Sequence, residues 1–483
     1  MSSNNKKDFV TMVYDVVADV VFFRDKNDTK TIYGEYYIDG TDRKFSNVLS
    51  NEFKAYVRMI IHNLKYKITE SSVIQYIQDA FTFDNSIPLI EPNIRIAGGL
   101  RTGIEYALND SNQNIVYVDS EGWNVAPSTA NSFFISYDHM LPQVKPKRTT
   151  KSIFDLLAPY VNLVGDSFIL FVIWLICTFA SGNNSISGLL VDAEKGSGKT
   201  FLSRIIRELS DPSKLDVTIF PTKIDELITL MVNTKFISFD NITQIPKEHS
   251  NILCVGITAG TTTKRSLFTT NELSIFKLNT IIVLNGIGVA LEDDLAQRCL
   301  YMKLPTIDEK KRKEADKLWD GFEADKPEIL GAIFDVLSKA MSLIDTIKID
   351  TLPRMASSFV SMAAIAAALD ISLDEFTRIY NDNVTAMNKA RADSPFVVAI
   401  REYMNSPLVP GRKAEALASK MLSNVRSIYS GDKNSLPKSA SIFSQQLKAD
   451  RDTLEIIGYK IFIDDTYSDG THISIIKSKN MST

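Results

Sequence analysis

The feature that most constrains this chain is a glycine-rich loop between an apolar run and an amphipathic run. Residues 187–192 (SGLLVD) have the composition of a buried strand, and residues 201–209 (FLSRIIREL) place their leucines and isoleucines on one helical face. Strand, glycine-rich loop and helix, in this order, are the context of a phosphate-binding loop. We therefore predict an α/β fold of the P-loop class. The predicted loop is Ala193, Glu194, Lys195, Gly196, Ser197, Gly198, Lys199 and Thr200.

Each residue type in this loop has a physical role. Gly196 and Gly198 allow backbone angles closed to other residues, so consecutive N–H groups can surround phosphate oxygens. The N-terminus of the following helix adds partial positive charge. Lys199 is expected to reach the β- and γ-phosphates of ATP, and the Thr200 hydroxyl to ligate Mg²⁺. Ala193 stands where many such loops have glycine, and a methyl group is tolerated at a strand end.

Two later apolar runs end in polar residues and predict neighbouring strands. Residues 235–239 lead to Asp240, 41 positions after Lys199, where a carboxylate can hold the water ligands of Mg²⁺. Asn241 can orient an attacking water but cannot accept its proton. Glu194 is an alternative, so the sequence leaves the general base open. Residues 279–284 lead to Asn285, where an amide can sense the γ-phosphate.

An arginine follows Asn285 after a short acidic run. Arg298 lies within residues 293–305 (DDLAQRCLYMKLP). In a ring assembly its guanidinium is expected to enter the neighbouring subunit's site and stabilise charge on the transferring phosphate, which contributes roughly 10³ to 10⁵ in rate. A surface ion pair is the alternative.

Residues 261–278 predict a β-hairpin whose turn lies at Asn271 and Glu272. Its cations are Lys264, Arg265 and Lys277, and they are candidates for contacts with DNA phosphates. Pairing of these cations with acidic residues on the sheet is the alternative.

The chain of 483 residues is too long for one hydrophobic core. We predict an N-terminal α+β domain over residues 1–140, a basic linker with two prolines over 141–151, an ATPase domain with its lid over 152–394, and a further domain over 395–483. The first domain carries no motif with chemistry, and DNA binding or a ring collar are its candidate roles. Its pattern predicts strands and helices at 20–23, 32–38, 52–64 and 72–81, and a meander over 94–97, 103–108, 115–119 and 122–125.

Residues 395–483 predict a winged helix. Three helices are expected at 396–403, 414–422 and 442–454, followed by a hairpin of 459–463 with 472–476. This region has 12 Lys and Arg against 9 Asp and Glu, whereas the whole chain carries −4. The third helix of such folds enters the major groove of DNA. A helix that serves protein contacts is the alternative. The candidate DNA contacts are Lys438, Gln445, Lys448 and Arg451.

Composition argues against a disulfide-stabilised protein and against a membrane protein. The three cysteines (Cys177, Cys254 and Cys299) lie far apart without paired spacing, which disfavours a disulfide framework and indicates a reducing cytoplasm. The most apolar stretch, residues 168–180, has 13 residues, and a membrane span needs about 20. We predict a buried helix beside the sheet and no membrane partner.

In combination, these motifs resemble those of the AAA+ ATPases of phages and mobile elements. The three-part layout is similar to the self-loading replication initiator helicases of staphylococcal pathogenicity islands, relatives of minichromosome-maintenance and superfamily-three helicases. The segments that carry the resemblance are 196–200 (GSGKT), 210–213 (SDPS), 239–242 (FDNI), 283–287 (VLNGI), 294–298 (DLAQR) and 352–355 (LPRM).

The resemblance implies a homo-oligomeric ring, expected to be a hexamer, that binds and unwinds DNA with 3′-5′ polarity. It implies that the hairpin points into the ring's channel and that Arg354 is a second sensor, contacting the γ-phosphate from the lid side. The favoured hypothesis is an ATP-driven helicase that initiates replication of a mobile element. An AAA+ helicase loader or partner-recruiting switch is the alternative. A packaging motor is disfavoured because no nuclease constellation follows the ATPase.

Overall fold

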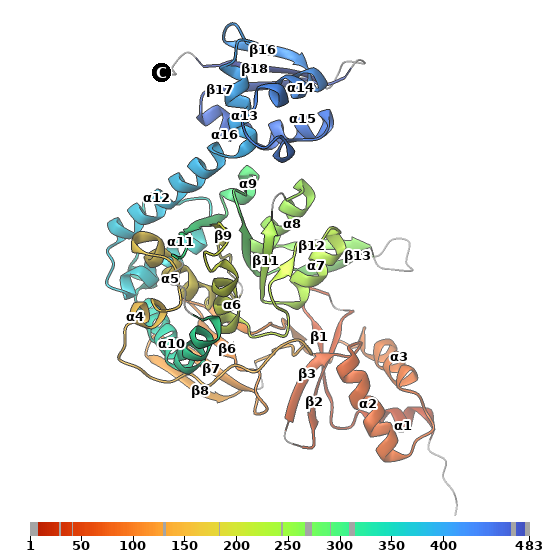
Figure 1. Ribbon diagram of the computed structural model, residues 1–483. Helices are drawn as coiled ribbons and strands as arrows, with labels where there is room; N and C mark the ends of the chain where they lie inside the picture. The colour runs from red at the N-terminus through yellow and green to blue at the C-terminus, as the bar shows by residue number, and fades with distance from the viewer. Residues whose placement is uncertain are drawn as a thin grey trace, which may run out of the picture.

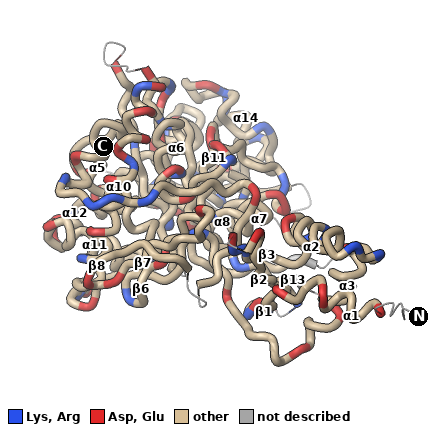
Figure 2. Tube along the Cα trace, turned by 90° about the horizontal axis from the view of Figure 1, so that it is seen from below, with Lys and Arg blue, Asp and Glu red and all other residues tan. Residues whose placement is uncertain are grey.

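A computed structural model describes residues 8–28, 30–40, 42–128, 132–182, 184–242, 245–265, 273–289, 291–308, 314–464 and 470–478. Figure 1 shows a central region between two end units, with the C-terminal helices and strands at the top and the N-terminal helices at the lower right. Figure 2 shows acidic and basic residues scattered over the trace between longer uncharged stretches, and the net charge of the chain is −4.

The N-terminal unit is a four-stranded sheet covered by three helices. Its strand order is β3-β2-β1-β4, and β4 is parallel to β1. Tyr36 and Phe53 are fully buried between sheet and helices. Strand β3 was not predicted from the sequence. The elements are α1 (Phe9–Val16), β1 (Val21–Asp25), β2 (Ile32–Ile38), β3 (Asp42–Asn47), α2 (Asn51–Leu64), α3 (Glu70–Phe81) and β4 (Leu89–Ile90).

The predicted meander is present as an antiparallel sheet, but it packs against the central region. Tyr106 and Trp123 belong to the same hydrophobic cluster as the helices beside the central sheet. Arg95, which is fully buried, donates to Asp211 of the central region at 3.0 Å. The strands are β5 (Ile96–Gly99), β6 (Gly103–Ala107), β7 (Asn114–Asp119) and β8 (Gly122–Pro127).

The predicted linker is extended and held in place along its length. The buried Gln143 side chain donates to the carbonyl oxygens of Glu208 and Leu209. Arg148 pairs with Asp335 at 2.6 Å and stacks over the Trp123 ring. These contacts hold the segment against two helices of the central region, one that carries Glu208 and Leu209 and one that carries Asp335.

The central region contains a five-stranded parallel sheet in the order β10-β11-β14-β9-β15. This confirms the predicted α/β class with a parallel sheet. The strands are β9 (Gly188–Ala193), β10 (Thr218–Ile219), β11 (Phe236–Ile242), β14 (Ile281–Gly286) and β15 (Cys299–Leu304). Beside them lies the hairpin of β12 (Thr261–Arg265) and β13 (Leu273–Lys277).

Helices cover both faces of this sheet. Helix α5 matches the predicted buried helix, and Trp174 on it donates to the Ser187 carbonyl at 2.7 Å. No helix in the described ranges is long and apolar enough to cross a bilayer. The helices are α4 (Ile153–Leu157), α5 (Gly165–Thr178), α6 (Lys199–Ser210), α7 (Ile224–Asn233), α8 (Lys247–Ile257), α9 (Asp293–Ala296), α10 (Ala315–Leu343), α11 (Ala356–Ala368) and α12 (Leu373–Ala392).

The C-terminal unit combines four helices with a three-stranded antiparallel sheet, in the order β16-β18-β17. Leu447 and Leu454, expected in the core, are fully buried. The elements are α13 (Pro395–Met404), β16 (Lys413–Leu417), α14 (Ala418–Ile428), α15 (Ala440–Ala449), α16 (Arg451–Ile456), β17 (Tyr459–Asp464) and β18 (His472–Lys477).

Two predictions for this unit were wrong in detail. Residues 413–417 form a strand, not the start of a helix, because they pair with β18 and bury Ala414 against Ile475. The helix predicted over 442–454 is two helices, α15 and α16. Asp450 separates them, and its buried carboxylate accepts from Gln446 at 2.8 Å.

Candidate nucleotide site

The loop between β9 and α6 has the geometry of an anion-binding turn. Gly196 and Gly198 have φ angles of 80° and 87°, in the left-handed region that favours glycine. Gly198 is the N-cap of α6, and no side chain caps this helix end. The Ser197 hydroxyl donates to the Glu194 carbonyl at 2.8 Å and closes the loop on itself. The N–H groups at the start of α6 are therefore arranged for an anionic group such as phosphate.

Lys199, Thr200 and Asp240 come together at the carboxyl ends of β9 and β11. The Thr200 hydroxyl donates to Asp240 Oδ2 at 3.2 Å, and Lys199 Nζ lies 3.7 Å from Asp240 Oδ1. The Lys199 and Asp240 side chains are 12% and 19% exposed, so both are shielded yet reachable. A hydroxyl beside a carboxylate is an oxygen pair that suits Mg²⁺. The residues present fit a magnesium-bound nucleotide.

The other residues of the predicted loop lie around this cluster. Ala193 is buried at the end of β9, where its methyl group is accommodated, and Glu194 and Lys195 are exposed. Asn241 is exposed, and its backbone has a left-handed φ of 55°. Its N–H donates to Asp240 Oδ1 at 2.8 Å and orients that carboxylate.

Asn285 occupies a deeper position than a direct phosphate sensor needs. Its side chain is fully buried in β14 and donates to Ser203 of α6 at 2.8 Å and to Ser238 of β11 at 3.0 Å. Its Oδ1 atom has no hydrogen-bond partner among the described residues. In this structure α6 and β11 hold the amide, and the role of Asn285 as a sensor of the γ-phosphate stays a prediction.

Arg298 and Arg354 meet at one carboxylate. Arg298 donates to Asp294 at 3.2 and 3.3 Å. Arg354 is paired with the same Asp294 and donates to Gln297 at 2.8 Å. Burial acts to raise the pKa of Asp294, but a hydrogen bond with Cys254 and the charges of Arg298 and Arg354 together hold it below its ordinary value. Arg298 is 18% exposed and Arg354 is 42% exposed, so the pair lies at a surface.

The sheet register places this arginine pair far from the phosphate loop of its own chain. Arg298 precedes Cys299, which pairs with Gly188 at the start of β9. The phosphate loop follows Ala193 at the other end of β9, about 17 Å along the strand at 3.3 Å per residue. Arg354 therefore does not lie at the phosphate loop of its own chain in this structure, and its role as a second sensor that contacts the γ-phosphate from the lid side stays a prediction. Both arginines lie near the opposite edge of the sheet.

Sequence reasoning missed a residue that braces the phosphate loop. Asn162, in the segment before α5, donates to the Ser197 carbonyl at 3.0 Å and to the Pro305 carbonyl at 2.6 Å. The Ile307 N–H donates to the Gly196 carbonyl at 3.4 Å. Asn162 lies 35 positions before Ser197 in no recognisable motif, so the sequence held no signal for it.

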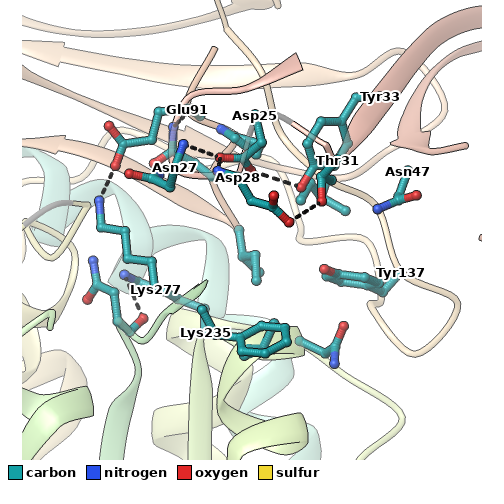
Figure 3. A pocket seen from close by; sticks show the side chains of 18 of the residues that line it. Asp25, Asn27, Asp28, Thr31, Tyr33, Asn47, Glu91, Tyr137, Lys235 and Lys277 are labelled. Atoms are coloured by element: carbon teal, nitrogen blue, oxygen red, sulfur yellow. Dashed lines mark hydrogen bonds and ion pairs between the residues drawn. The ribbon is translucent and has the colours of Figure 1, made fainter. Parts of the chain in front are cut away.

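The hairpin is confirmed as an antiparallel pair, but one of its cations is engaged elsewhere. Lys277 lies at the base of the hairpin opposite Thr261, and it forms an ion pair with Glu91 of the N-terminal part. Figure 3 shows this pair at the edge of a cavity of about 480 Å³, which Asp25 and Asp28 also line. Lys277 thus pairs with an acidic residue, but this residue belongs to the N-terminal part and not to the central sheet, where the alternative had placed it.

The remaining hairpin cations lie at the far end of β12. Lys264 is opposite Ser274 and Arg265 is opposite Leu273 in the backbone register. The predicted turn at Asn271 and Glu272 lies outside the described residues.

The predicted DNA contacts of the C-terminal unit all lie at its surface. Lys438 precedes α15, Gln445 and Lys448 lie on α15, and Arg451 begins α16. All four side chains are exposed. Gln445 and Lys448 also line a groove that the central region closes on its other side.

Comparison with solved structures gives low identities throughout. The structure described as "SCCmec type IV Cch - active helicase" is 13% identical, with a TM-score of 0.43, and the alignment covers 95% of this chain and 93% of the other. The NrS-1 C-terminal region is 10% identical, with a TM-score of 0.41, over 96% and 98% of the two chains. A JCV helicase bound to a small molecule is 14% identical, with a TM-score of 0.26, over 49% and 65%.

Comparison with protein families is more specific, although no curated protein matches the sequence significantly. The match covers residues 154–385, which include the phosphate loop, Asp240, Arg298 and Arg354. It agrees with the predicted resemblance to replication proteins of mobile elements. Residues 154–385 of this chain thus match the model of the actinomycete integrative conjugative element replication protein family.

Proposed function

We propose that this protein is an ATP-driven AAA+ ring helicase that initiates replication of a mobile genetic element. The observation that carries the proposal is the cluster of Lys199, Thr200 and Asp240 at the carboxyl edge of the parallel sheet. Ligands bind at this edge in open α/β sheets. The match to a replication protein family supports a role in replication.

Different residues of the chain have different roles at the nucleotide. The N–H groups at the start of α6 and Lys199 bind the phosphates, and Thr200 and Asp240 hold Mg²⁺. The metal ion supplies positive charge that neutralises the phosphate oxygens during transfer. Asn241, next to Asp240, orients the attacking water. Asn285 acts indirectly, by positioning helix α6. Its buried amide donates a hydrogen bond to the Ser203 hydroxyl on that helix.

The site is complete only when a second subunit contributes. Arg298 and Arg354 lie too far from their own phosphate loop, and they reach the surface at the other edge of the sheet, where Arg298 is partly exposed and Arg354 is exposed. In a head-to-tail ring, that edge faces the neighbour's nucleotide. We therefore assign both arginines to the adjacent subunit's site, in a hexameric ring, where they stabilise the transferring phosphate.

DNA is engaged at two places in this proposal. The β12–β13 hairpin carries Lys264 and Arg265 toward the channel, where single-stranded phosphates are held. The element order of the C-terminal unit, helix–strand–helix–helix–helix–hairpin, supports a winged helix in which α15 is the reading helix for duplex DNA. The proposed domain limits are 1–140, 152–394 and 395–483, with the meander β5–β8 of the first segment packed against the central region.

A forked duplex with a 3′ single-stranded tail tests the proposal. Strand separation that requires ATP is expected, with ATP turnover stimulated by DNA. A duplex with only a 5′ tail serves as the polarity control. ATP turnover and DNA binding without strand separation would instead identify a helicase loader or a recruiting switch.

Asn162→Ala should weaken nucleotide binding by about tenfold, because the amide holds Ser197 and Pro305 together and each lost hydrogen bond is worth about 1 kcal/mol. Affinity for a fluorescent ATP analogue measures this effect. Asn184→Ala is a matched control, because the Asn184 amide donates to the Ala180 carbonyl and this hydrogen bond lies away from the phosphate loop. Unchanged affinity in Asn162→Ala would mean that the hydrogen bonds of Asn162 do not hold the phosphate loop in its binding conformation.

A further inference from the structure

A short turn in the central region places a carboxylate beside the arginine assigned to the neighbouring subunit. Helix α9 has four residues, and the Arg298 N–H extends its turn by donating to the Leu295 carbonyl at 3.0 Å. Leu295 is fully buried and Ala296 is 4% exposed, so one side of the turn is fixed in the core. Asp294 and Arg298 are four positions apart, which places them one turn apart, and both reach the surface. The backbone around α9 thus sets the distance between this carboxylate and this guanidinium.

Asp294 binds Arg298 through two hydrogen bonds. Arg298 Nε donates to Oδ2 of the carboxylate at 3.2 Å, and Nη2 donates to Oδ1 at 3.3 Å. Two parallel hydrogen bonds fix the plane of a guanidinium as well as its position. A guanidinium carries more N–H groups than these two bonds use. Arg298 can therefore bind a phosphate oxygen while its pair with Asp294 stays in place.

The same carboxylate holds Arg354, which lies 60 positions away in the sequence. Arg354 forms an ion pair with Asp294, and its Nη1 donates to Gln297 Oε1 at 2.8 Å. The next residue, Met355, is 3% exposed and belongs to the same hydrophobic cluster as Leu295. The segments that carry the two arginines are thus anchored in one core and paired with one carboxylate.

The Asp294 cluster differs from an ordinary surface ion pair. An isolated exposed pair contributes little, unless its geometry is bidentate or several charges form a network. Here the pair with Arg298 is bidentate, the Arg298 side chain is only 18% exposed, and a second arginine shares the carboxylate. Asp294 therefore constrains both guanidinium groups more strongly than one exposed ion pair would.

The charges of this cluster explain why a carboxylate is needed between the arginines. Two guanidinium groups close to one another repel, and an opposite charge between them removes much of that repulsion. Two positive charges and one negative charge still leave the cluster positive overall. A positive cluster with further N–H donors fits an additional anion, and arginine is well suited to bind phosphate.

We propose that Asp294 is a positioning residue that holds Arg298 and Arg354 together, so that both reach the phosphates of one nucleotide on the adjacent subunit. The inference rests on the proposed function, because it takes from it the site shared between subunits. Asp294 acts through the two arginines and does not itself touch the nucleotide. Its loss separates the arginines and misplaces them, although both remain in the chain.

Asp294→Asn in the full chain tests this role. The amide keeps the size of the side chain but removes the charge that holds both guanidinium groups. Turnover at saturating ATP should fall about 10- to 100-fold, since a displacement of about 1 Å near a reacting group can cost about 10²-fold. Affinity for a fluorescent ATP analogue should be unchanged, because the phosphate loop belongs to the other side of the interface. A loss of affinity as large as the loss of turnover would place Asp294 in nucleotide binding and overturn the proposal.

Asp382→Asn is the matched control. Asp382 also pairs with an arginine four positions away on a helix, Arg378 at 3.0 Å, and its side chain is 63% exposed. Its loss should change neither turnover nor nucleotide affinity. Native turnover in Asp294→Asn would show that the arginines need no carboxylate between them, and would overturn the proposal.

Mixing Asp294→Asn chains with Lys199→Ala chains shows on which subunit's nucleotide Asp294 acts. Where an Asp294→Asn chain supplies the phosphate loop, a Lys199→Ala neighbour supplies an intact Asp294 with both arginines. Turnover in an equal mixture should therefore rise to about one quarter of the native rate, the share of interfaces with both intact residues.

A parallel mixture of Arg298→Ala and Lys199→Ala chains separates the two possible failures. If this mixture regains turnover and the Asp294→Asn mixture does not, Asp294 acts within its own subunit's site, and the positioning role is overturned while the shared site stands. If neither mixture regains turnover, the shared site of the proposed function is overturned, and the role of Asp294 with it.

Discussion

Lys199→Ala lowers the rate of ATP turnover by at least about 10²-fold, since removal of a single group that stabilises transition-state charge has effects of this size. The structural reason is that Lys199 lies beside Asp240 at the end of the phosphate loop, where its charge is shielded and directed at bound phosphate. Steady-state phosphate release measures the effect, and circular dichroism with a thermal melt checks that the fold is intact.

Lys195→Ala is the matched control for this experiment. Lys195 belongs to the same loop, yet its side chain is exposed, so its removal should leave most of the turnover. Turnover in Lys199→Ala equal to that of the native chain would place the nucleotide site elsewhere in the molecule.

Mixtures of Arg298→Ala and Lys199→Ala chains regain ATP turnover although each variant alone is inactive. A working site needs Lys199 from one subunit and Arg298 from its neighbour, because the sheet register keeps them apart within one chain. In a ring assembled at random from equal amounts, about one quarter of the interfaces contain both intact residues. Loss of the arginine alone should lower turnover by roughly 10³- to 10⁵-fold. Phosphate release at varied mixing ratios measures the recovery.

The same mixing experiment with Arg354→Ala distinguishes the two possible positions of this arginine. Recovery with Lys199→Ala chains is expected, since Arg354 shares Asp294 with Arg298. An arginine that acts within its own subunit gives no recovery, because each site then lacks one of the two residues. Native chains diluted with Lys199→Ala chains control for loss of activity through mixing itself. Failure of the Arg298 mixture at every ratio would exclude action between subunits.

The phosphate site could be predicted from the sequence because its chemistry is local. The loop from Ala193 to Thr200 is continuous, and its glycines require the backbone angles that the structure shows at 196 and 198. The position of Asp240 could be predicted in the same way. Parallel strands end at one edge of a sheet, and a polar residue at a strand end therefore lies at that edge. The buried helix α5 followed from composition alone, because the apolar run of 13 residues over 168–180 has to be covered.

Local patterns were less informative where tertiary pairing decides the structure. Residues 413–417 have the composition of a helix, but hydrogen bonds to β18 make them a strand. The break between α15 and α16 depends on the buried Asp450 carboxylate, which accepts a hydrogen bond from Gln446. The spacing of apolar residues along this segment reveals neither feature. Strand β3 is formed by polar residues whose partner, β2, precedes them in a hairpin.

By itself, the sequence determined a nucleotide loop, a parallel α/β core and the polar residues at the ends of its strands, because these follow from neighbouring residues. Only the tertiary structure placed Arg354 beside Asp294, Asn162 behind the phosphate loop, Lys277 against Glu91 and α15 opposite α8. Each of these contacts joins segments that lie many residues apart. Their formation depends on how helices and sheets pack in space, and short-range periodicity carries no information about that packing.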